Sequence, residues 1–102
     1  MLQNHQKQPM TVQRAEAIAA TALAFVAQDV GRLTQFLSAT GLSPQALRRD
    51  ASSHRVLAAV LEHLAGDESL LLVFASGAQV SPAEIAPARD VLQADIARSD
   101  SA

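Results

Sequence analysis

A repeat with an offset of 38 residues is the feature that most constrains the fold of this 102-residue chain. Both halves carry an apolar stripe at helical spacing, then an Asp, a second apolar segment and a Ser-Pro pair. The matching positions are Ile18 and Val56, Ala19 and Leu57, Ala22 and Val60, Leu23 and Leu61, Val26 and Leu64, Asp29 and Asp67, Leu33 and Leu71, Phe36 and Phe74, Leu42 and Val80, Ser43 and Ser81, Pro44 and Pro82, and Leu47 and Ile85. Because one unit cannot bury its stripe alone, we expect the units at about 15–50 and about 53–88 to pack together.

Each unit predicts a helix, a second helix that Asp caps, and a short third helix that begins at Ser-Pro. Asp and Ser side chains accept hydrogen bonds from the first amides of a helix, and Pro lacks the amide hydrogen that would stay unpaired. The predicted fold is therefore all-α, a compact orthogonal bundle of about six to seven short helices with a two-fold internal pseudo-repeat. We expect a disordered tail over residues 1–10, one domain over 11–97 and fraying over 98–102.

Two segments carry further structural predictions. Residues 70–75, LLLVFA, are apolar all round, which favours a central buried helix over the alternative of a buried strand. Gly77 is expected to end that helix. Pro87 lies too deep for the first turn of a helix that starts at Ser81, so a break or kink is expected there. The predicted core consists of Ile18, Leu23, Val26, Leu33, Phe36, Val56, Val60, Leu61, Leu64, Leu71 and Phe74.

The stretch TGLSPQALRR, residues 40–49, has features of a helix-turn-helix. In this interpretation Gln45, Arg48, Arg49 and Arg55 would contact bases or phosphates, and His54 would extend the patch. However, the Ser-Pro connection recurs at residues 81–82 without a nearby basic residue, and useful affinity needs several phosphate contacts. Helix capping is therefore the favoured interpretation, and nucleic-acid binding is the alternative.

Catalytic and metal-binding chemistry has little support in the sequence. His63 and Asp67 are four residues apart, as two metal ligands on one helix would be, but Gly66 interrupts the helix and Asp67 serves as a cap. The chain has no Cys, Trp or Tyr, and no phosphate loop, nucleophile motif or paired carboxylates. We expect no enzymatic activity, no catalytic residues, no metal and no cofactor.

Charge and hydropathy indicate where the chain resides. The net charge of -2 gives no long-range attraction for nucleic acid or an acidic membrane. The longest apolar stretch, residues 17–27, is too short to span a bilayer, and the first ten residues do not form a secretory signal. We therefore expect a cytoplasmic protein without membrane association.

The segments RAEAIAATALAFVAQDVGRLTQFLSATGLSPQALR and VLAAVLEHLAGDESLLLVF resemble a family of short alphaproteobacterial proteins that is classed as a domain of unknown function. The similarity covers about residues 14–92, and its most recognisable parts are FLSATGLSP and GDESLLLVF. The resemblance implies a small cytoplasmic helical domain, and it brings no catalytic residues.

A non-enzymatic protein-interaction module is the function that we expect from these patterns. A high apolar fraction in so small a chain must either form the core or remain exposed as a binding patch. The partner would be another protein or a second copy of the chain. A nucleic-acid-binding accessory protein is the alternative, and a small enzyme or metal site at His63 and Asp67 is the third hypothesis.

Overall fold

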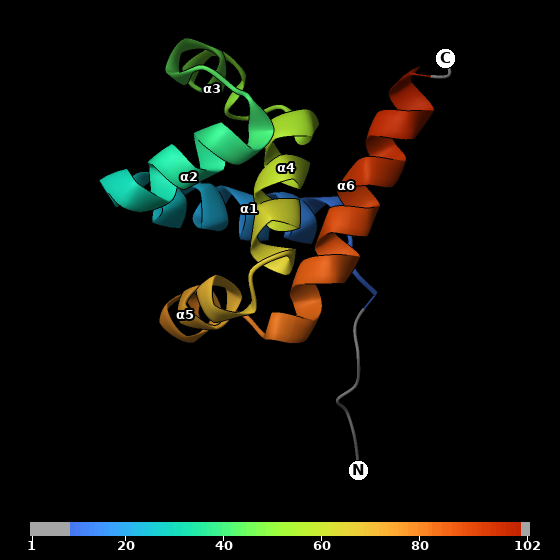
Figure 1. Ribbon diagram of the computed structural model, residues 1–102. Helices are drawn as coiled ribbons and strands as arrows, with labels where there is room; N and C mark the ends of the chain where they lie inside the picture. The colour runs from blue at the N-terminus through green and yellow to red at the C-terminus, as the bar shows by residue number, and fades with distance from the viewer. Residues whose placement is uncertain (1–8, 101–102) are drawn as a thin grey trace.

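The computed structural model describes residues 9–100, which fold into six α-helices and one 3-10 turn with no strand in that range (Figure 1). The expected all-α fold is thus confirmed. The elements are α1 (Val12–Ala27), α2 (Val30–Thr40), α3 (Pro44–Asp50), α4 (His54–Ala65), α5 (Glu68–Ala78), η1 (Pro82–Glu84) and α6 (Ile85–Asp100). Residues 1–8 of the expected N-terminal tail lie outside the described residues.

Helices α1, α4 and α6 form the centre of the domain. Helix α6 packs most extensively against α4, and α1 crosses both of them (Figure 1). Helix α2 contacts α1 and α4, and α5 contacts the same two helices on the other side. Helix α3 lies at the periphery, beyond the end of α2.

The predicted N-caps are confirmed by their hydrogen bonds. The Asp29 carboxylate accepts from the Arg32 amide at 2.9 Å, and the Asp67 carboxylate accepts from the Leu70 amide at 3.1 Å. The hydroxyl of Ser43 accepts from the Ala46 amide at 3.0 Å. These side chains satisfy amides that have no partner inside their own helix.

Helices α2 and α5 are each followed by a residue in the left-handed conformation. Gly41 ends α2 with φ 75°, a conformation that glycine adopts without steric cost. The left-handed residue that caps the C-terminus of α5 is Gln79, with φ 58°, so the expected cap at Gly77 was wrong by two residues. At each end the amide of the left-handed residue donates to a carbonyl four residues earlier, Leu37 or Ala75.

Eight of the eleven predicted core residues are buried, and the other three are only partly buried. The buried ones are Ile18, Val26, Phe36, Val56, Val60, Leu61, Leu64 and Phe74. Leu23, Leu33 and Leu71 pack against the edge of this core instead. The predicted apolar stripes therefore face the core, but each includes residues at its edge that the neighbouring helices cover only in part.

Helix α5 is not the central buried helix that its apolar sequence predicts. Phe74 and Ala75 are its only buried residues, whereas Leu72 is 49% exposed and Val73 is 54% exposed. Helix α5 lies on the edge of the domain and packs against its neighbours through one side (Figure 1). Its apolar residues therefore exceed what one buried face requires.

The expected break at Pro87 is also wrong. The chain first makes the 3-10 turn η1, with Ser81 and Glu84 forming a capping box, and α6 begins only at Ile85. Pro87 therefore falls in the first turn of α6, where a missing amide hydrogen costs nothing. Helix α6 then continues to Asp100, over three residues of the stretch in which we expected fraying.

Membrane association was not expected from the sequence. Among residues 9–100 no single helix has both the length and the apolar character to cross a bilayer. Only α5 together with η1 and α6 reaches that length and composition, and this pair is bent by 111°.

Candidate functional site: an apolar groove along helix α1

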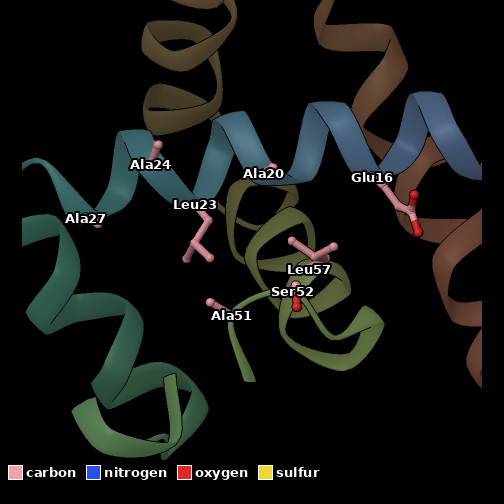
Figure 2. Close-up of a pocket in the computed structure, with 8 residues that line it drawn as sticks. All are labelled: Glu16, Ala20, Leu23, Ala24, Ala27, Ala51, Ser52 and Leu57. Atoms are coloured by element: carbon pink, nitrogen blue, oxygen red, sulfur yellow. The ribbon is translucent and has the colours of Figure 1, made fainter. Parts of the chain in front are cut away.

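An open apolar groove of about 580 Å³ runs along one side of α1 (Figure 2). One wall is a stripe of α1, and the other is formed by the α3–α4 connection and the first turns of α4. The lining residues are Glu16, Ala20, Leu23, Ala24, Ala27, Ala51, Ser52 and Leu57. We call this surface the α1 groove. Its size lies in the range of pockets that bind ligands or protein side chains.

The sequence of α1 explains why a groove forms here. One face of the helix, which includes Ile18, Ala22 and Val26, is buried against the domain. The groove stripe lies on another face, where Ala20, Ala24 and Ala27 are exposed. Alanine side chains extend little from the helix axis, so this side of α1 is apolar and hollow at the same time. Helix α3 ends at Asp50 and leaves the stripe uncovered.

A cluster of three titratable side chains lies at the Glu16 end of the groove. His54 Nε2 is 2.6 Å from Glu16 Oε2, and His54 Nδ1 is 2.6 Å from Asp95 Oδ2. The three residues belong to α4, α1 and α6, so the imidazole connects the central helices. Two carboxylate acceptors suit an imidazolium that donates from both nitrogens. The hydrogen bond with Glu16 contributes most to raising the pKa of His54 above its usual value; the Asp95 hydrogen bond adds to this and desolvation opposes it.

The contacts of this cluster join three helices through one imidazole. Both nitrogens of His54 are occupied by carboxylates, so neither is directed toward a substrate. Residues 9–100 contain no group of three or more His, Asp or Glu side chains that could hold a metal ion. Sequence reasoning missed the cluster because its members lie 38 and 41 residues apart and only the packing of α1, α4 and α6 brings them together.

The four residues of the predicted nucleic-acid patch are exposed, and two of them, Arg49 and Arg55, are paired with aspartates. Gln45, Arg48 and Arg49 lie on α3, and Arg55 lies on α4. Arg49 donates to Asp50 at 2.9 Å, and Arg55 donates to Asp100 at 2.5 Å. The bond to Asp50 raises the pKa of Arg49 and lowers that of Asp50. These aspartates offset two of the three positive charges that would face a phosphate backbone.

The proposed metal pair, His63 and Asp67, has separate partners. The ring of His63 packs edge-on against Phe36, with 5.4 Å between the ring centroids. The Asp67 carboxylate is the N-cap of α5. The sequence spacing suggested that His63 is a metal ligand, whereas its ring packs against the buried Phe36.

Comparison with known proteins places the chain in a family without assigning an activity. No curated protein and no solved structure matches it. A family model described as a protein of unknown function, DUF3572, matches residues 12–95, which include all of α1 to α5, η1 and most of α6. The resemblance seen in the sequence, to a domain family of unknown function, is thereby confirmed. The chain belongs to the DUF3572 family.

Proposed function

We propose that this protein is a non-enzymatic protein-interaction module that binds another protein through the α1 groove. The observation that carries the proposal is an open groove whose eight lining residues include six Ala and Leu, with Ser52 beside them and a single carboxylate, Glu16, at one end. Apolar surface left in water favours association with another apolar surface.

Affinity capture with a groove variant tests the proposal. Ala24 is exposed at the centre of the groove stripe, so Ala24→Gln places a polar side chain there with little effect on the helix. Ala17 is an exposed alanine of the same helix that does not line the groove, so Ala17→Gln is the matched control. Each tagged protein is used as bait in a nuclease-treated lysate of the source organism.

We expect the wild-type chain and Ala17→Gln to retain the same protein, and Ala24→Gln to lose it. A protein retained equally by all three baits would place the interaction outside the groove. The wild-type bait is also run in a lysate without nuclease. Retention that occurs only there, and that is lost with Arg48→Ala and Arg49→Ala, would favour the nucleic-acid alternative instead. Absence of any specific protein on the wild-type bait would count against the module itself.

A further inference from the structure

The α1 groove has a counterpart on α4 that another helix of the molecule partly covers. Adding 38 to the α1 stripe gives a stripe of α4. The corresponding pairs are Ala20 and Ala58, Leu23 and Leu61, Ala24 and Glu62, and Ala27 and Ala65. Ala58 and Leu61 are buried, whereas their counterparts Ala20 and Leu23 are exposed and partly buried, respectively. Glu62 and Ala65, toward the end of α4, are exposed like their counterparts.

Helix α6 is the element that packs against α4. Arg89 on α6 donates to the Glu62 carboxylate at 3.1 Å, which places α6 beside this stripe. In the first half of the chain, the corresponding short helix α3 stops at Asp50, and the chain turns at residues 51–53 before α4. The stripe of α1 therefore lacks the covering helix that α4 has.

We propose that the α1 groove binds an amphipathic α-helix of another protein, with aliphatic side chains on the alanine stripe and a Lys or Arg near Glu16. This inference rests on the proposed function and names its partner. The stripe from Ala20 to Ala27 is about 10 Å long at the rise of an α-helix, and alanines allow two helix axes to approach closely.

The Lys or Arg that we assign to the partner helix is inferred from the hydrogen bonds of Glu16. Its Oε2 accepts from His54, while Oε1 has no hydrogen-bond donor within the described part of the chain. The Glu16 side chain is 44% exposed at the end of the groove (Figure 2). A cationic side chain on a docked helix would supply the missing donor.

A second copy of this chain fits the groove less well than a different protein. Among the described residues, the exposed large hydrophobic side chains are Leu72 and Val73 of α5 and Val30 at the start of α2, where the nearby Arg32 already lies over the Phe25 ring. Helix α5 therefore offers the broader apolar face. Its sequence, ESLLLVFASGA, contains Glu68 and no basic residue, so it offers no cation to Glu16. Charge complementarity therefore selects a different protein as the partner.

Three synthetic helical peptides test the inference by fluorescence anisotropy with the full-length protein. Each has the 16-residue length of α6 and leucines at helical i, i+3, i+4 and i+7 spacing. They differ at one terminal position, which carries Lys, Gln or Glu. The proteins are wild type, Ala24→Gln, Ala17→Gln and Glu16→Gln. Methyl spectra of Leu23 and Leu57 report whether each peptide occupies the groove.

We expect the Lys peptide to bind the wild-type chain about threefold to fivefold more tightly than the Gln peptide, because a single exposed ion pair contributes that much. The Glu peptide should bind most weakly. Glu16→Gln should remove the preference for Lys, and Ala24→Gln should weaken all three peptides while Ala17→Gln binds like wild type.

Equal affinities of the three peptides for the wild-type chain would overturn the assignment of a cation at Glu16. Absence of shifts in the methyl signals of Leu23 and Leu57 would overturn the helix as occupant.

The capture experiment separates this inference from the proposed function. If capture still yields a protein whose retention depends on Ala24, the proposed function stands and only the helix inference fails. If all capture baits behave alike and no peptide binds, both fail. Sedimentation of the wild-type chain as a dimer that Ala24→Gln converts to a monomer would make a second copy the occupant.

Discussion

Helices α2 and α5 are built alike, and each anchors itself with one phenylalanine. Both have 11 residues, an Asp N-cap and a left-handed residue after the last turn. Phe36 of α2 packs on the His63 ring and Phe74 of α5 packs on the Phe25 ring, with 5.4 Å between centroids in each case. The offset of 38 residues relates both partners, so each helix contacts a ring of the other half. The two ring contacts correspond to each other under the sequence offset of 38, and the repeat itself stays a prediction.

The two helices differ on the side that faces away from the core. Thr34 and Gln35 of α2 correspond by the offset to Leu72 and Val73 of α5. All four residues are exposed. The comparison teaches that the caps and one buried ring are shared by the two helices, while the outer positions vary independently of the local fold.

The largest expected effect comes from truncating the two rings. Phe36 is 0% exposed and Phe74 is 1% exposed, so Phe36→Ala and Phe74→Ala each remove a fully buried side chain. We expect each to lower the free energy of unfolding by about 3 to 5 kcal/mol, measured by urea denaturation. The two losses should be similar because the two helices are anchored alike. A loss below about 1 kcal/mol for either variant would break the comparison.

The caps could be read from the sequence because they depend on local contacts. Asp29, Asp67 and Ser43 each bond an amide three residues later, a relation that is visible in a linear sequence. The position of α5 could not be read, because its apolar run fits a central helix and an edge helix equally well. Which of the two forms depends on how many neighbours pack around it, and that is a property of the whole fold.

The candidate site shows the same limit. The alanine stripe of α1 is present in the sequence, but the groove exists only because α3 stops and the chain turns at residues 51–53. None of the sequence patterns singled out Ala20, Ala24 or Ala27 as a binding surface. His54 was predicted to extend a basic patch, whereas its ring is paired with Glu16 and Asp95.

An intermediate effect on the free energy of unfolding is expected from the contact between Glu16 and His54. Glu16 and His54 are related by the same offset and are in direct contact. The pKa of His54 is raised in the folded state, chiefly by its hydrogen bond with Glu16, so the folded chain holds the proton more tightly. This stabilisation is fully present below the unfolded pKa of about 6.5 and is lost as pH rises through the folded pKa.

Urea denaturation of the wild type and His54→Gln measures this contribution. We expect the variant to be about 1 kcal/mol less stable than the wild type near pH 5, with a smaller difference near pH 8. Arg98, which donates to Asp95 at 3.2 Å, is the neighbouring charge, and Arg98→Gln serves as the control for effects through Asp95 alone. A difference that grows as pH rises would contradict the role of protonated His54.

The smallest effect is expected from exchanging the outer faces of α2 and α5. Leu72→Thr with Val73→Gln gives α5 the outer residues of α2, and Thr34→Leu with Gln35→Val does the reverse. Since these side chains are at the surface, each pair should change the free energy of unfolding by less than about 1 kcal/mol in total. Circular dichroism during urea denaturation measures this change. A loss of about 2 kcal/mol or more in the α5 pair alone would mean that Leu72 and Val73 support the domain, and the two helices would then differ in how they are anchored as well as in their surfaces.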